Sequence, residues 1–125
     1  MKVICIIDCK EDLRKALMLK LTTLFVSYEL EKLQEYFSDD IGWTLVGENP
    51  IWGKEKFLSA LSLHQKNKAV VLRIDKIIVE NNLAAINGSM TMQNDERYGF
   101  SDIYSFADAD FRKVEFITSY VSKLN

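Results

Sequence analysis

The sequence has few of the residues that usually build metal or nucleophilic centres, with one histidine, His64, and two cysteines, Cys5 and Cys9. Two thiols cannot form a disulfide scaffold, and these three side chains cannot complete the four-ligand set of a structural zinc site. A disulfide between Cys5 and Cys9 needs an unusual local backbone, so we interpret both as structural or incidental. The five glycines are dispersed and form no phosphate-binding loop. We therefore expect no metal and no cofactor.

Neither sign of charge predominates, because 16 Lys and Arg residues stand against 18 Asp and Glu residues and give a net charge of −2. Nucleic-acid binding normally requires a basic stripe to offset phosphate charge, and none is present. The apolar stretch at residues 1–7 contains one lysine, is interrupted by Asp8 and is too short for a secretory signal. No stretch approaches the roughly 20 apolar residues of a membrane span. We expect a cytoplasmic protein with no nucleic-acid partner and no membrane partner.

The apolar residues that are present follow a helical period in the first half of the chain. This spacing predicts a first helix over 9–26, a shorter second helix between Ser27 and Asp39, and a third over 54–63. Asp8 and Glu11 match a capping box for the first helix, and Ser27 matches the N-cap of the second.

Strands are predicted at residues 3–7 and 41–47, and from residue 69 the whole pattern changes to strands. The segments 69–80, 83–93, 97–107 and 112–122 are separated by turn sequences at 81–82, 94–96 and 107–110, which indicate consecutive hairpins. No linker or repeat divides the chain, so residues 1–125 are predicted to form one domain. Helices followed by a strand meander are typical of an α+β fold with helices on one face of an antiparallel sheet.

Three stretches at matching separations resemble the nuclear transport factor 2-like superfamily, which includes the SnoaL-like proteins. They are residues 37–43 (FSDDIGW), residues 53–57 (GKEKF), and residues 101–106 (SDIYSF) with Lys113-Val114 and Thr118-Ser119-Tyr120. The resemblance covers about Leu13 to Tyr120. It implies a cystatin-like cone, in which a curved antiparallel sheet wraps around three N-terminal helices and encloses one pocket. It also implies a homodimer through the outer face of the sheet. Because the superfamily hosts many activities, the fold does not choose a reaction.

Strand alternation places Asp102 on the inner face of this cone. Tyr98, Phe100, Asp102, Tyr104 and Phe106 share one face of the strand at 97–107, and this face is the more apolar one. Burial disfavours the charged form of a carboxyl and raises its pKa, so Asp102 is our candidate general acid or base. The alternative is a structural carboxylate that accepts hydrogen bonds from tyrosine or backbone donors.

Within the superfamily, the ketosteroid isomerases carry a carboxylic acid at a position similar to Asp102. The position of their catalytic base is similar to Leu45 or Val46, and that of their oxyanion-hole tyrosine is similar to Leu21. None of these three side chains can transfer a proton. The resemblance therefore does not extend to steroid isomerase chemistry.

The predicted pocket wall consists of residues on the inner face of several strands. We name Trp43, Met90, Phe100, Tyr104, Ile117 and Ser119 as candidate ligand-binding residues. Core packing alone also explains Trp43, and Met90 with Met92 suits either a core or an adaptable pocket. His64 is interpreted as a solvated imidazole at the end of the third helix.

Three functions remain open at this point. The first is the binding of a small apolar molecule in a pocket with a single acid, oriented by Asp102 and Tyr104. The second is an enzyme of the cyclase, isomerase or dehydratase type that uses Asp102. The third is an interaction module, in which an apolar row on the outer face of the last strand, Val114, Phe116 and Tyr120, pairs two copies.

Overall fold

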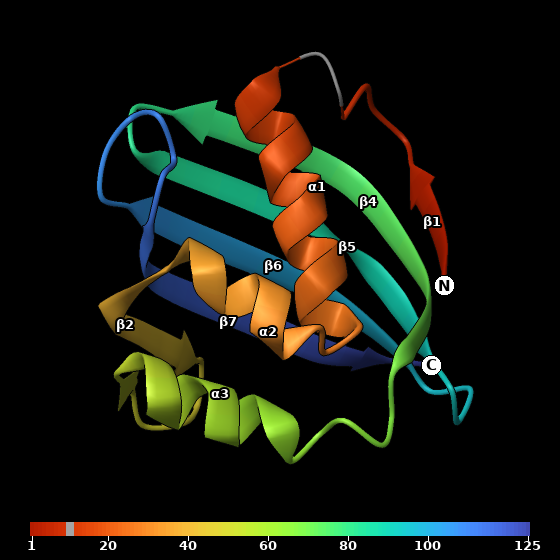
Figure 1. The fold of residues 1–125 in the computed structure, drawn as a ribbon. Helices are drawn as coiled ribbons and strands as arrows, with labels where there is room; N and C mark the ends of the chain where they lie inside the picture. Colours follow the sequence, from red (N-terminus) through yellow and green to blue (C-terminus); the bar gives the residue numbers. More distant parts are fainter. Residues whose placement is uncertain (10–11) are drawn as a thin grey trace.

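The computed structural model describes residues 1–9 and 12–125 and contains helices packed against one curved sheet (Figure 1). The helical elements are α1 (Leu13–Val26), α2 (Leu30–Leu33), the 3₁₀ turn η1 (Gln34–Tyr36) and α3 (Lys54–Ser62). The strands are β1 (Lys2–Cys5), β2 (Phe37–Leu45), β3 (Ile51–Trp52), β4 (Ala69–Glu80), β5 (Leu83–Met92), β6 (Arg97–Phe106) and β7 (Val114–Leu124). They form one seven-stranded sheet in the order β1-β4-β5-β6-β7-β2-β3. The predicted α+β cone is confirmed.

The sheet is mixed, whereas the sequence analysis expected an antiparallel one. The hairpins from β4 to β7 are antiparallel as predicted, but β1 pairs with β4 and β2 pairs with β7 in parallel. Parallel strands need a long connection between them, and the helices supply it here, because α1 to α3 lie between β1 and β4 in the chain. In Figure 1 the helices lie across one face of the sheet.

The sheet bends where β4 and β5 come unusually close together. The register between them shifts between Ile74 and Lys76, which marks a β-bulge opposite Gly88. A Cβ atom on Gly88 would lie 1.8 Å from the carbonyl oxygen of Arg73, so only glycine permits this approach. Bulges increase the local twist and bend the strand that carries them. The concave face that holds the helices follows from this bend.

Helix α1 begins later than predicted. Its N-cap is Asp12, whose side chain accepts a hydrogen bond from the backbone N–H of Arg14 at 2.7 Å. The predicted start at residue 9 with an Asp8 and Glu11 capping box is therefore wrong, and Glu11 itself lies outside the described residues. The physical reason is that Asp12 supplies a side-chain acceptor immediately before the apolar helical pattern.

Ser27 ends α1 and does not begin the second helix as predicted. Its hydroxyl donates to the carbonyl of Thr23, and its backbone N–H also bonds within the last turn of α1. Tyr28 then takes a positive φ of 54°, which turns the chain before α2 starts after Glu29. Gly53, at φ 98°, makes the corresponding turn into α3, which ends at Ser62.

The core lies between the helices and the concave face of the sheet. The alternation predicted for β6 is confirmed, because Phe100, Asp102, Tyr104 and Phe106 are buried while Ile103 is exposed. The outward position predicted for Val114 is wrong, because this side chain is fully buried. A register shift between Ser105 and Phe106 marks a bulge at Glu115, so Val114 and Ile117 both point inward. A bulge of one residue reverses the alternation that precedes it.

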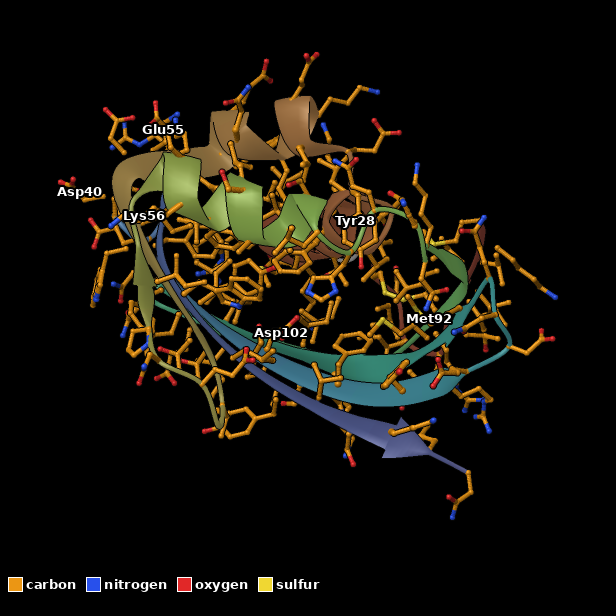
Figure 2. The ribbon with its side chains drawn as sticks, turned by 90° about the horizontal axis from the view of Figure 1, so that it is seen from below. Tyr28, Asp40, Glu55, Lys56, Met92 and Asp102 are labelled. Carbon is orange, nitrogen blue, oxygen red and sulfur yellow. A yellow bond between two sulfur atoms is a disulfide. The ribbon has the colours of Figure 1, made fainter. Side chains whose placement is uncertain are left out.

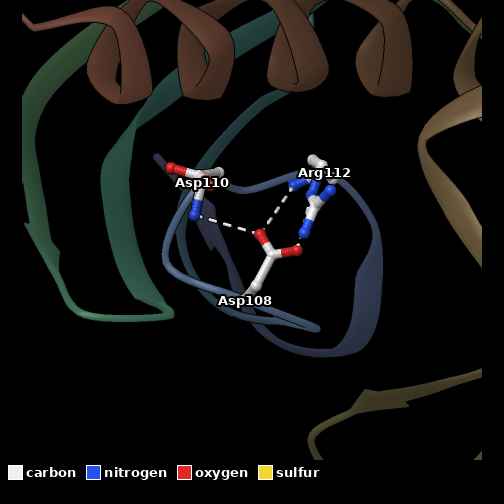
Figure 3. A network of polar contacts seen from close by, with 3 residues as sticks. All are labelled: Asp108, Asp110 and Arg112. Carbon is white, nitrogen blue, oxygen red and sulfur yellow. Dashed lines mark hydrogen bonds and ion pairs between the residues drawn. The ribbon is translucent and has the colours of Figure 1, made fainter.

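The turn between β6 and β7 carries a buried aromatic ring on a polar frame. Asp108 accepts hydrogen bonds from the backbone N–H of Asp110 at 3.0 Å and from Nε of Arg112 at 2.7 Å (Figure 3). Phe111 lies within this hydrogen-bonded turn with a φ of 59°. Its ring stacks on that of Phe106 with 4.0 Å between the ring centroids. The turn predicted at 107–110 thus extends further and closes one end of the core.

A disulfide joins Cys5 and Cys9, whose Cα atoms are 6.5 Å apart. The chain bends at Ile6 and Ile7 after β1, which brings the two cysteines within the range of Cα separations that disulfides span.

None of the helices in the described ranges 1–9 and 12–125 is both long enough and apolar enough to cross a bilayer.

We expect that Gly88→Ala lowers the free energy of unfolding by about 2–3 kcal/mol, because the new methyl group overlaps backbone that cannot move aside. Gly99→Ala is the matched control in the next strand, since its Cβ would meet the Leu124 side chain at 3.6 Å and the carbonyl oxygen of Gly88 at 4.0 Å, both ordinary van der Waals contacts. That variant is expected to change stability by no more than about 0.5 kcal/mol. Urea denaturation of both variants measures this, and equal midpoints would contradict the role given to Gly88.

Candidate functional site

An apolar cavity of about 180 Å³ lies between α1, α3 and the concave face of the sheet. Its wall combines predicted residues with others that the sequence analysis did not single out. The predicted ones in the wall are Trp43, Met90, Phe100, Asp102 and Ser119. In Figure 2 Asp102 lies on the sheet beneath the helices. Tyr28 lies on the helix side, and Met92 lies on the sheet side.

Asp102 is positioned by the register of β6 between its neighbours. It pairs with Ile86 of β5 and with Ser119 of β7, and its side chain points toward the helices with only 8% of the residue exposed. Burial raises the pKa of Asp102 to about 7, and a hydrogen bond from the Ser119 side chain partly opposes this shift. The carboxyl can therefore exist as a neutral donor or as a carboxylate near pH 7.

Ser119 connects Asp102 to the indole of Trp43. The Nε1–H of Trp43 donates to the Oγ of Ser119 at 3.0 Å. Since that bond uses a lone pair of the hydroxyl, the single proton of Ser119 remains free for the carboxyl of Asp102. One chain of polar contacts thus runs from β2 through β7 to β6.

The Trp43 ring is fixed on both sides by other aromatic rings. It stacks on Phe57 of α3 with centroids 4.6 Å apart and an interplanar angle of 10°. Phe25 of α1 meets it edge to face at 5.8 Å. Trp43 therefore packs in the core and also contributes to the cavity wall, so both of the alternatives considered for it from the sequence apply.

Tyr104 and Ile117, also predicted as ligand-binding residues, are fully buried and do not belong to the wall of this cavity. Burial raises the pKa of Tyr104 well above its usual range, and the nearby Asp102 carboxyl adds to the shift, while the Thr22 hydroxyl opposes it. Neither the Tyr104 hydroxyl nor that of Thr22 makes a hydrogen bond of ordinary geometry to any residue in the described ranges. Tyr104 thus lies behind the wall as a neutral phenol.

The helix side of the cavity is closed by residues that were not predicted from the sequence as site residues. Phe25, Val26 and Tyr28 come from the end of α1, and Leu61 and His64 come from the end of α3. His64 is exposed, as predicted for a helix end, but it also faces the cavity. Leu45, which matches the base position of the isomerases, lines the cavity without a titratable group. Helical spacing identified these residues as apolar and could not show which helix end covers which part of the sheet.

Across the part of the chain that the structure describes, no group of three or more His, Cys, Asp or Glu side chains is arranged to hold a metal ion.

No protein-family model and no curated protein sequence matches this chain. Among solved structures, an NTF2-like protein of unknown function from Cytophaga hutchinsonii is 20% identical with a TM-score of 0.66, over 86% of this chain and 97% of that one. An NTF-2 like protein of unknown function from Burkholderia xenovorans is 21% identical with a TM-score of 0.72, over 94% of this chain and 88% of that one.

A third similar structure comes from Shewanella denitrificans and is provisionally described as a SnoaL-like polyketide cyclase. It is 9% identical with a TM-score of 0.74, over 90% of this chain and 92% of that one. The chain has the NTF2-like fold. At these identities the likeness extends to the NTF2-like cone and not to the residues inside it, so function has to be argued from the cavity.

The raised pKa of Asp102 predicts how stability depends on pH. Because the folded state holds this proton more tightly than the unfolded state, the contribution of Asp102 is lost as the pH rises from about 4 to above 7. Relative to Asp102→Asn, the wild type is expected to lose about 2.5 kcal/mol of unfolding free energy between pH 5 and pH 8.

Urea denaturation at the two pH values measures this difference. Asp12, Glu96 and Asp108 have lowered pKa values and respond to pH in the opposite direction, but they are present in both proteins and cancel. Parallel pH profiles for the wild type and Asp102→Asn would show that the carboxyl has an ordinary pKa.

Proposed function

We propose that this protein binds a small, largely apolar molecule in the cavity, with Asp102 and Ser119 as its polar contacts. The observation that carries the proposal is a carboxyl with a pKa raised to about 7 in a mainly apolar wall that contains several aromatic rings. Such a carboxyl gives up hydration when buried and regains a hydrogen bond when it meets a ligand oxygen. Tyr104, expected to orient the ligand together with Asp102, is replaced in this role by Ser119, which belongs to the wall.

The part of the ligand that meets Asp102 is uncharged and carries a hydrogen-bond acceptor. A protonated Asp102 donates one hydrogen bond, and a carbonyl or ether oxygen accepts it. An anionic group at this position would meet the partly ionised carboxyl at short range, which raises the energy of the bound state. Phe25, Trp43 and Phe100 supply flat apolar surface around the same point.

The experiment compares cyclohexanone with cyclohexane, which have similar shapes and differ in one acceptor. At pH 5.5, where Asp102 is protonated, cyclohexanone is expected to bind about fivefold more tightly, as one hydrogen bond provides. Quenching of tryptophan fluorescence and the shift of the melting temperature report binding. Asp102→Leu should remove the preference, and Asp110→Leu, at an exposed turn, should keep it. Failure of both compounds to bind would contradict the proposal.

A second candidate is proton transfer by Asp102, in an enzyme of the cyclase, isomerase or dehydratase type. It is favoured by the pKa of about 7, which suits a general acid or base at neutral pH. Titration of Asp102 distinguishes the candidates, since a pKa near the reference value of about 3.9 removes this one and leaves binding in place.

We also propose a homodimer through the outer face of the sheet. Pairing places Ile78, Ala85, Ile103 and Thr118 in one row across β4 to β7, and Ile78 and Ile103 are 63% and 43% exposed. Phe116 and Tyr120 of the predicted apolar row lie on either side of this row, in register with the exposed Glu80 and Lys76 of β4, whereas the buried Val114 does not face outward. The Oδ1 of Asn87 has no hydrogen-bond partner within the described chain, and a second copy could supply a donor. Exposed apolar surface bordered by polar and charged residues is typical of an interface.

Analytical ultracentrifugation tests the dimer. We expect a dimer for the wild type and a monomer for Ile103→Glu, because the new carboxylate would be buried without a partner. Leu13→Glu is the matched control, since Leu13 is an equally apolar and more exposed side chain at the start of α1, on the helix side. A monomeric wild type at micromolar concentration would contradict the proposal.

A further inference from the structure

A second depression adjoins the cavity on its open side. It measures about 380 Å³, and it shares Tyr28, His64, Met90, Met92 and Val121 with the cavity wall. The inner cavity of about 180 Å³ is smaller than the roughly 300 Å³ at which ligand pockets usually begin. The two spaces together reach that range. A ligand that fills the inner cavity therefore has room to continue outward past Tyr28 and Met92, which line both spaces and are labelled in Figure 2.

The chemistry of the outer depression differs from that of the inner cavity. Lys66, His64 and Asn67 line it from the segment that follows α3, and none of its lining residues is acidic. Lys66 is exposed and makes no ion pair with any residue that the structure describes. The nearby Tyr98 donates to Glu96, but that carboxylate is already paired with Lys123 at 2.7 Å. This outer depression, which forms the mouth of the cavity, thus carries an unbalanced positive charge.

Asn67 adds an unsatisfied polar group to the same wall. Its Oδ1 is buried and has no hydrogen-bond partner in the described ranges, although Asn67 lines the depression. The unpartnered oxygen is an acceptor, so Asn67 contacts an anion when its side-chain amide is turned and the NH₂ donates beside Lys66 and His64. Buried polar atoms without a partner are uncommon and call for one.

The segment that carries these groups is held in place by the backbone. The N–H of Asn67 donates to the carbonyl of His64 at 3.2 Å. Two hydrogen bonds join Lys68 to Gln93, just after β5. The backbone N–H of Gln93 donates to the carbonyl of Lys68 at 2.9 Å, and the backbone N–H of Lys68 donates to Oε1 of Gln93 at 3.1 Å. The positions of Lys66 and Asn67 relative to Met90 and Met92 are therefore set before a ligand arrives. Exposed apolar side chains, Leu63 at 83% and Val121 at 45%, border the same mouth.

We propose that the cavity and the outer depression form one site for an elongated amphipathic anion. Its apolar part fills the inner cavity, and its anionic group lies in the outer depression beside Lys66, Asn67 and His64. This proposal rests on the proposed binding function and adds the ligand class and its orientation. The opposite orientation would bring the anionic group to Asp102, in a cavity lined by no lysine or arginine and only by the His64 that it shares with the outer depression. The two ends of the site therefore select opposite ends of the ligand.

The experiment compares octanoate with 1-octanol, which share a chain length and differ in the charge of the head group. At pH 6.5 and low salt, octanoate is expected to bind about fivefold more tightly, in the range that one partly exposed ion pair provides. The preference should disappear in Lys66→Gln and decrease in 0.5 M NaCl through screening. Tryptophan fluorescence and isothermal titration calorimetry measure both affinities.

Lys56→Gln is the matched control. Lys56 is an exposed lysine on α3, away from the mouth marked by Tyr28 and Met92 in Figure 2, and its removal should leave the preference unchanged. Equal affinity for the two probes, tighter binding of 1-octanol, or an equal loss in Lys56→Gln would overturn the proposal.

Binding of cyclohexanone without either eight-carbon probe would also overturn it, while the proposed function would stand. Failure of all the probes would contradict both.

Discussion

The close approach of β4 and β5 at Gly88 is the constraint on which the rest of the structure depends. The carbonyl of Arg73 occupies the space that a side chain would need, and the bulge beside it bends the sheet. A flat sheet would leave α1 and α3 on a plane with no enclosed volume. Because the sheet is concave, the helices cover its ends unequally and leave the apolar cavity beside Asp102.

The polar chain from Trp43 through Ser119 to Asp102 connects that architecture to the chemistry of the cavity. Each of the three residues comes from a different strand, and they meet only because β2, β7 and β6 are adjacent in the sheet. The stacking of Trp43 on Phe57 fixes the first donor, and the register of β7 fixes Ser119 opposite Asp102. The carboxyl is thus positioned precisely enough to meet a ligand, yet it retains a pKa near neutrality because apolar side chains surround it.

The electrostatic difference between the two ends of the site has a simple origin. Asp102 belongs to the middle of a strand and is screened from water by the helices, whereas Lys66 follows the end of α3 and remains exposed. Charge is costly in the first environment and inexpensive in the second. An apolar inner end and a cationic outer end are the result.

The sequence by itself determined the class of fold, the hairpins from β4 to β7, and the inward position of Asp102, because period-2 alternation is a local property. It did not determine the inward position of Val114, since one bulge at Glu115 reverses the alternation and depends on pairing with β6. The parallel partners of β1 and β2 and the contribution of His64, Tyr28 and Lys66 to one opening were likewise decided by tertiary structure. These residues are far apart in the chain, and only the packing of helix ends against the curved sheet brings them together.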